Sequence, residues 1–450
     1  MIWYLLILHT LSFQSELTID EVTQIDVTLV DVLVLDAKGN PIRDLQQQDF
    51  RVYENQKQVS LNYFEVMDFR DPARLEPSQN DPEMQTLILI LDLARMDLPA
   101  TRTTLQAVRS FLEQQPSLFP AQTMLYSFDT GRITTGFLRD KAAILDDFTQ
   151  FEINFLNRRE ALPALHEPFH LATLERELHQ CVPKMQRAPS AWQSSSAGTM
   201  GRNCLLVAYD QFRNRHQQQS EAILSGFTQV LSSLSGIEGL KSVYLVSPGF
   251  SLAPCETASH LASRYLQTVS TSQRTGLFSS GSLAPGVQAE GSTSASLDLN
   301  QILNSRAPVA NVFTTHNFER ELLELAHHAF LNRTVIHTFS VTQNLLSERQ
   351  NHAFANAEAT YSALAGTYQN FAAELDYGLQ ALSSATGGLH CRDKHIGQHL
   401  QETFQSSSVY YVLGYSPPLR KGEKHHRLRV ECTRPDTVVY TQSGFFRLAP

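Results

Sequence analysis

The chain lacks the short patterns that mark the commonest catalytic and nucleotide-binding sites. Its 450 residues contain no GxSxG, GxxxxGK[ST], GxGxxG or HExxH sequence. Those patterns place a nucleophile, a phosphate-binding backbone or a pair of zinc ligands at fixed positions. No other set of residues resembles a nucleophile with its base and orienting group. We therefore predict that the protein is not an enzyme.

Cysteine is also scarce. The chain has five, and no two have CxxC spacing, so zinc-ribbon and thioredoxin-like sites are excluded. An odd number leaves at least one thiol unpaired in a monomer. Which cysteines pair, if any, stays open among Cys181, Cys204, Cys255, Cys391 and Cys432.

The chain has no excess of basic residues. Lysine and arginine number 36 against 45 aspartates and glutamates, which gives a net charge of -9. Nucleic-acid binding relies on a basic surface that neutralises phosphates. We therefore exclude nucleic acid as a partner.

Long apolar runs are absent as well. The apolar stretch at residues 1–13 is shorter than the roughly 20 residues that cross a bilayer as a helix. It is similar to the apolar part of a secretory signal. We predict a signal peptide over 1–15, an exported protein that is periplasmic or extracellular, and no transmembrane span in the mature chain. A buried first element and a misplaced start codon are the alternatives.

Alternating apolar and polar residues occur at both ends of the chain. They predict β-strands within 16–68 and again within 408–447. A few strands with one apolar face need a second layer to cover that face. We therefore predict one β-sandwich built from both chain ends, with everything between them inserted.

The middle of the chain, residues 84–407, alternates strands with helices. Buried apolar runs at 86–92, 123–128, 241–247 and 334–341 are separated by helical patterns. This rhythm predicts an α/β fold with a doubly wound, mostly parallel sheet and helices on both faces. Three stretches interrupt it, and such insertions commonly carry binding specificity; they are 161–199, 251–315 and 343–369.

Seven stretches, taken in order, resemble the VWFA-related (von Willebrand factor A-type) domain family typical of acidobacterial exported proteins. The likeness covers nearly the whole chain. Each stretch is weak alone, and their order and spacing make the match fairly specific. They are Val32-Leu-Val-Leu-Asp-Ala-Lys-Gly-Asn-Pro41, Leu45-Gln-Gln-Gln-Asp-Phe-Arg-Val-Tyr-Glu-Asn55, Leu89-Ile-Leu-Asp92, Val246-Ser-Pro-Gly-Phe250, Ala385-Thr-Gly-Gly388, Tyr410-Tyr-Val-Leu-Gly-Tyr-Ser-Pro417 and Gly444-Phe-Phe446.

The resemblance implies a sheet that serves adhesion or complex assembly. Many such domains bind Mg²⁺ at a DxSxS loop, with help from a threonine and a second aspartate. Here the matching positions are Asp92, Ala94 and Met96, so both hydroxyl ligands are missing. Where related domains have Ser-Asp-Gly, this chain has Ser247, Pro248 and Gly249.

We therefore predict a degenerate metal-ion-dependent adhesion site and no cofactor. Mg²⁺ would be the ion of an intact site, with Asp92, Asp97 and Thr199 as the remaining candidate ligands. The expected function is an exported protein-binding or assembly module for an unidentified protein partner. The residues expected to line the carboxyl edge of the sheet are Asp92, Ala94, Arg95, Met96, Asp97, Ser247 and Gly249.

Two alternatives stay open. Residues 390–399 contain the only metal-like cluster, in which His395 and His399 would share one face of a helix, a spacing that zinc sites use. That would fit a zinc-dependent enzyme or sensor, although a solvated histidine pair has the same pattern. The other alternative is a structural envelope component without a discrete ligand.

Overall fold

The computed structural model describes residues 27–69, 85–161, 171–186, 197–253, 255–263, 317–341, 358–392, 395–416 and 425–446. The predicted signal peptide at 1–15 lies outside these residues, as do most of the predicted insertions. Within the described ranges, no helix combines the length and apolar character needed to cross a membrane.

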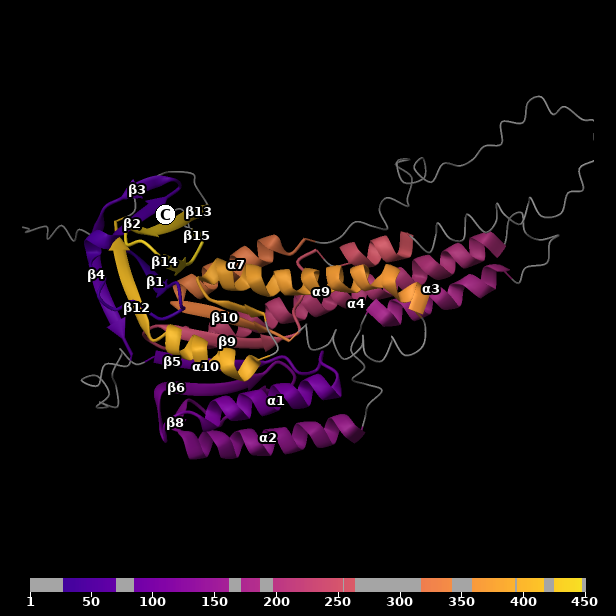
Figure 1. The fold of residues 1–450 in the computed structure, drawn as a ribbon, viewed down its shortest axis with the longest axis horizontal. Helices are drawn as coiled ribbons and strands as arrows, with labels where there is room; N and C mark the ends of the chain where they lie inside the picture. The colour runs from indigo at the N-terminus through magenta and orange to yellow at the C-terminus, as the bar shows by residue number, and fades with distance from the viewer. Residues whose placement is uncertain are drawn as a thin grey trace, which may run out of the picture.

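A seven-stranded, mostly parallel sheet forms the centre of the molecule, with the strand order β11-β10-β9-β5-β6-β7 and with β8 also paired to β6 (Figure 1). The strands from β11 to β6 run parallel, whereas β7 and β8 are antiparallel to β6. The strands are β5 (Gln85–Leu91), β6 (Leu118–Ser127), β7 (Gly131–Arg132), β8 (Leu138–Asp140), β9 (Lys241–Ser247), β10 (Thr334–Ser340) and β11 (His390–Arg392).

Helices cover both faces of this sheet because its central strands are apolar on both sides. All seven residues of β5 are buried. Leu87, Leu89 and Leu91 pack with the helices of one face, and Ile88 and Ile90 with those of the other. The first face carries α1 (Leu98–Glu113), α2 (Lys141–Ala161) and α10 (Ile396–Ser406), and the second carries α4 (Ala197–Ser233), α7 (Glu319–Leu331) and α9 (Glu358–Thr386).

The order of the strands reverses between β5 and β9. From β5 the chain moves outward to β6, and it later returns to β9 on the other side of β5 before moving on to β10 and β11. In open α/β sheets, the carboxyl ends of the two strands at such a reversal are where ligands bind. The carboxyl ends of β5 and β9 are therefore the first place to look for a site.

Strands from both chain ends share two antiparallel four-stranded sheets, which we call the terminal β unit. One sheet has the order β14-β1-β12-β4 and the other β15-β13-β2-β3. Side chains from both sheets form a common apolar core, which includes Val32, Val52, Tyr411 and Val430. The elements are β1 (Thr28–Asp36), η1 (Gln47–Asp49), β2 (Phe50–Glu54), β3 (Lys57–Val59), β4 (Leu61–Asp68), β12 (Val409–Tyr415), β13 (His425–Cys432), β14 (Thr437–Thr441) and β15 (Gly444–Phe446).

The terminal β unit packs against the amino ends of the central strands. Leu35 and Val412 share an apolar cluster with Leu240 and Val335. Arg333, just before β10, also forms an ion pair with Asp31 of β1 at 2.5 Å. The carboxyl edge of the central sheet therefore lies at the end of the sheet away from this unit (Figure 1).

A disulfide joins Cys181 of α3 (Leu171–Gln186) to Cys204 of α4. The two helices share an apolar cluster with Cys255 and with residues of α9. Cys255, Cys391 and Cys432 remain as thiols. The pairing that the sequence left open is thereby assigned within the structure.

Candidate functional site

Two polar side chains meet where the strand order reverses. Asp92 directly follows β5, and Ser247 is the last residue of the neighbouring parallel strand β9. The Asp92 amide donates to the Val246 carbonyl at 3.0 Å, which continues the strand pairing to the sheet edge. The Ser247 hydroxyl donates to the Asp92 carboxylate at 2.7 Å. Both side chains are buried.

The guanidinium of Arg95 lies between these two strand ends. Its Nε is 3.1 Å from each Asp92 carboxylate oxygen, and a terminal nitrogen also donates to that carboxylate. The same nitrogen donates to the Ser247 hydroxyl at 3.0 Å, and the other donates to the Gly249 carbonyl. Only 16% of the Arg95 side chain and 4% of the Asp92 side chain are exposed, so the ion pair is largely shielded from water.

The oxygens around Arg95 are of the kinds that hard cations use as ligands. A carboxylate, a hydroxyl and a backbone carbonyl converge on a single positive charge. Arginine suits this position because its planar group donates several hydrogen bonds in fixed directions and keeps its charge when buried. The chain thus places its own cation at the edge of the sheet.

Gly249 is required by the geometry of the loop after β9. Its φ is +93°, a left-handed conformation that glycine adopts readily. A Cβ at this position would lie 2.5 Å from the Leu375 carbonyl oxygen of α9. The next residue, Phe250, donates its amide to that same carbonyl at 3.1 Å. Helix α9 therefore fixes the loop whose Gly249 carbonyl accepts from Arg95.

A second aspartate, which the sequence reasoning did not single out, lies beside this ion pair. Asp129 follows β6 and accepts hydrogen bonds from the Ala94 amide at 3.0 Å and the Ser127 hydroxyl at 3.4 Å. Although Asp129 as a whole residue is exposed, desolvation of its carboxyl group, and then the charge of Asp92, raise its pKa to about 6. An acid just after the predicted strand 123–128 was the signal that could have identified it.

Arg159 of α2 lies under the loop that follows β5. One of its terminal nitrogens donates to the Leu93 carbonyl at 2.6 Å and to the Thr101 hydroxyl at 2.9 Å. Burial lowers the pKa of Arg159, while Asp129 and Asp97 act in the opposite direction. Nothing in the local sequence of α2 indicated this role, because its contacts come from residues far along the chain.

The predicted edge residues divide into two groups. Asp92, Arg95, Ser247 and Gly249 come together as described, and Ala94 contributes its amide. Met96 does not line the edge: its side chain is fully buried in the core, within 3.5 Å of the Thr104 hydroxyl. Asp97 caps α1 by accepting from the Ala100 amide at 2.9 Å.

Most of the residues predicted to line this edge are not open to solvent. Asp92, Met96, Ser247 and Gly249 are buried, and Ala94, Arg95 and Asp97 are partly buried. Burial follows from the hydrogen bonds between the loops, which draw the polar groups inward. Thr199 lies in the first turn of α4, where its side chain falls outside the described part of the structure.

The residues of the predicted zinc cluster are spread over several elements. His390 lies on β11, with its Nδ1 2.8 Å from the Thr338 hydroxyl and its Nε2 3.3 Å from the carboxylate of Asp376. His395 precedes α10, whereas His399 lies within it and contacts the Glu402 carboxylate at 3.1 Å. Among the described residues, no three His, Cys, Asp or Glu side chains form a group that could hold a metal ion.

The ionisation of Asp129 gives a direct test of this geometry. Because desolvation of the carboxyl group and the charge of Asp92 both disfavour the charged form, the Asp129 carboxyl should titrate near pH 6 in the folded protein. An Asp92→Asn substitution removes one of the two causes and should shift the titration to lower pH. Carbon-detected NMR of the aspartate carboxyls would follow the Asp129 titration in the wild type and in the variant. An unchanged titration in the variant would contradict the coupling.

The raised pKa also fixes the sign of a stability effect. The pKa of Asp129 in the folded state exceeds the ordinary value of 3.8. Between pH 3.8 and about pH 6, the folded state therefore binds the Asp129 proton more tightly than the unfolded state does. Its contribution to stability is therefore greatest at low pH and is lost as the pH rises through this window. Asp129→Asn should remove that part of the pH dependence.

Comparisons with protein-family models, curated proteins and solved structures yield no match to this chain.

Proposed function

We propose that this chain is a non-enzymatic protein-binding or assembly module with a von Willebrand factor A-type sheet, in which Arg95 takes the place of the usual metal ion. The observation that carries the proposal is the oxygen-lined position between β5 and β9, which the Arg95 guanidinium occupies. It lies at the strand reversal where ligands of such sheets bind.

The buried ion pair accounts for the substitutions in the predicted metal loop. With a guanidinium beside Asp92, hydroxyl groups at positions 94 and 96 would have no metal ion to bind. The chain has Ala94, which supplies only a backbone amide, and Met96, which adds to the core. A partner would then contact the loops at this edge directly, without a bridging metal.

Export of the protein is part of the same proposal. The disulfide between Cys181 and Cys204 supports it, because such bonds persist mainly in oxidising compartments. The apolar amino end, with its likeness to a signal peptide, agrees with that location.

Photo-crosslinking in the native host tests the proposal. A photoreactive residue at Thr130, which is exposed next to Asp129, should capture one defined protein. The same residue at Gln218, which is exposed on α4, should not capture it. Chelation of divalent metals should leave the yield unchanged, because Arg95 supplies the positive charge.

An Ala94→Arg substitution should abolish the crosslink from Thr130, since it adds a bulky charged side chain at the edge. Capture that disappears on chelation would show a metal-bridged contact and would overturn the role given to Arg95. Equal capture from Thr130 and Gln218, or none from either, would overturn the proposed binding edge.

A further inference from the structure

The terminal β unit has an exposed strand edge on the side where β3 and β4 lie. These two strands are the outermost strands of their sheets, and a single residue, Ser60, links them. Among the described strands, β4 pairs only with β12. An edge of this kind has backbone groups available for pairing with another strand, which proteins usually obstruct with charged residues.

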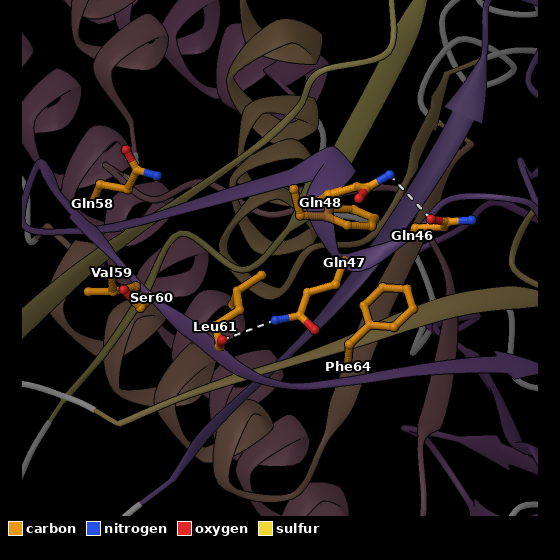
Figure 2. A pocket seen from close by; sticks show the side chains of 9 residues that line it. Gln46, Gln47, Gln48, Gln58, Val59, Ser60, Leu61 and Phe64 are labelled. Atoms are coloured by element: carbon orange, nitrogen blue, oxygen red, sulfur yellow. Dashed lines mark hydrogen bonds between the residues drawn. The ribbon is translucent and has the colours of Figure 1, made fainter.

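A pocket of about 700 Å³ borders the first half of this edge on the inner side (Figure 2). Its lining carries no charged side chain, only carboxamides, one hydroxyl and apolar groups. The lining residues are Gln46, Gln47, Gln48, Phe50, Gln58, Val59, Ser60, Leu61 and Phe64.

One glutamine of the pocket already binds the strand edge. The Gln47 side chain donates to the Leu61 backbone carbonyl at 3.0 Å, as Figure 2 shows. Gln48 donates to the Gln46 side chain at 3.2 Å. A carboxamide both donates and accepts, so these side chains match the groups of a peptide backbone or of a neutral polar side chain.

The outer side of the same edge carries an exposed apolar patch. Val27, Leu29 and Tyr63 are 44%, 36% and 43% exposed. They meet around Gly414, where an added Cβ would lie 2.7 Å from Tyr63 and 3.2 Å from the Leu29 and Val27 side chains. Further along this face, Leu33 and Val412 are covered by the central sheet. The patch thus lies at the end of this face away from the residues that the central sheet covers.

We propose that the edge of β4 from Leu61 to Phe64 binds an extended, uncharged segment of a partner protein, which adds to the sheet as a strand. Successive side chains of a strand point to opposite faces, so alternate residues of the partner would meet the pocket and the patch. Polar amide or hydroxyl side chains fit the glutamines, and apolar ones fit Tyr63 and Leu29.

The pocket side excludes a charged segment, because a charge placed against its neutral lining would lose water without gaining a counter-charge. At the patch, the Tyr63 hydroxyl donates to the Glu65 carboxylate at 2.5 Å, which disfavours an acidic residue of the partner there. Acidic residues begin further along β4, at Glu65 and Asp68, which confines the site to the first half of the strand. This site is separate from the edge around Arg95.

A pool of capped heptapeptides provides the test. In the pool, valine, isoleucine or tyrosine alternates with glutamine, serine or threonine. We expect members of this pool to bind at about 1 mM or below and to protect from hydrogen exchange those amides of residues 61–64 that point away from β12. Methylation of alternate backbone nitrogens should weaken binding by about tenfold or more, because it removes the strand hydrogen bonds.

Protein variants separate the two faces of the site. Gln58→Glu should weaken binding by charging the pocket, and Tyr63→Lys by charging the patch. Gln218→Glu, on the exposed surface of α4, is the matched control and should bind as the wild type does.

Three results would overturn the proposal. One is the absence of binding by every uncharged peptide at about 1 mM. The others are equal binding by the methylated peptides and protection confined to amides outside 61–64. Binding only by neutral oligosaccharides, run in parallel, would equally reject a strand partner.

Discussion

Replacing Arg95 by alanine should lower the free energy of unfolding by about 3 to 5 kcal/mol, which is the usual cost of removing one partner from a buried ion pair. The loss is large because Asp92 would stay buried with its carboxylate uncompensated. The Gly249 carbonyl would also lose the donation from Arg95, and the Ser247 hydroxyl would keep only the Gly249 amide as a donor. Urea unfolding of the variant and the wild type, followed by circular dichroism, measures the difference.

Two further variants identify the cause of this loss. Arg95→Lys keeps the charge but not the planar set of donors, so it should lose less than the alanine variant. The double variant Asp92→Asn with Arg95→Ala should recover part of the stability, because no isolated charge is left. An alanine variant within about 0.5 kcal/mol of the wild type would show that the ion pair does not hold the edge together.

A divalent cation should partly restore the Arg95→Ala variant. Removal of the guanidinium leaves the oxygens of Asp92, Ser247 and Gly249 facing a vacated position, and oxygen ligands of these kinds bind Ca²⁺ and Mg²⁺. Millimolar Ca²⁺ should raise the unfolding midpoint of the variant and leave the wild type unchanged. Equal shifts in both proteins would indicate a cation site elsewhere.

Replacing Gly378 by alanine should destabilise the fold by about 3 kcal/mol, at the upper end of the cost of overpacking. The added Cβ would lie 2.0 Å from the Phe250 carbonyl oxygen, so either α9 or the loop after β9 must move. Within a helix, glycine to alanine is ordinarily favourable by about 1 kcal/mol, so a net loss shows that the contact dominates.

The Gly378→Ala variant should also reduce the yield of the partner protein that a photoreactive residue at Thr130 crosslinks. Displacement of Phe250 carries Gly249 with it, and the Gly249 carbonyl accepts from Arg95. Gly236→Ala is the matched control, because an added Cβ there would meet nothing within 4 Å. Thermal unfolding and crosslinking yield would be measured for both. A Gly378→Ala protein as stable as the control would contradict the close approach of α9.

Much of the architecture could be predicted from local patterns. The run ending at Asp92 reads as a buried strand because apolar residues occupy both of its faces, and β5 is buried along its whole length. Near Leu29 the apolar residues switch from one face of the strand to the other, which predicts either a bulge or a strand buried on both faces. In the structure both faces are buried: the valines from Val30 to Val34 contribute to the core between the two terminal sheets, and Leu33 and Leu35 pack with the central sheet.

The candidate site was predictable only in part. Asp92 and Ser247 were identified because each ends a predicted strand, and parallel strands end at the same edge. Met96 was misplaced because the sequence does not show which way a loop side chain turns. Arg159 had no signal at all, since its acceptors at Leu93 and Thr101 lie about 60 positions away, with separations of 66 and 58 residues.

The sequence by itself determined that a parallel strand delivers Asp92 to a sheet edge and that positions 94 and 96 of the loop that follows carry no hydroxyl. Both features can be read from the sequence, because the strand depends on the pattern of neighbouring residues and the loop composition depends on residue type alone. Only the tertiary structure decided what balances Asp92. The partners of Arg95 on β9 lie 152 and 154 positions away, and an arginine side chain takes the orientation in which distant acceptors satisfy its charge.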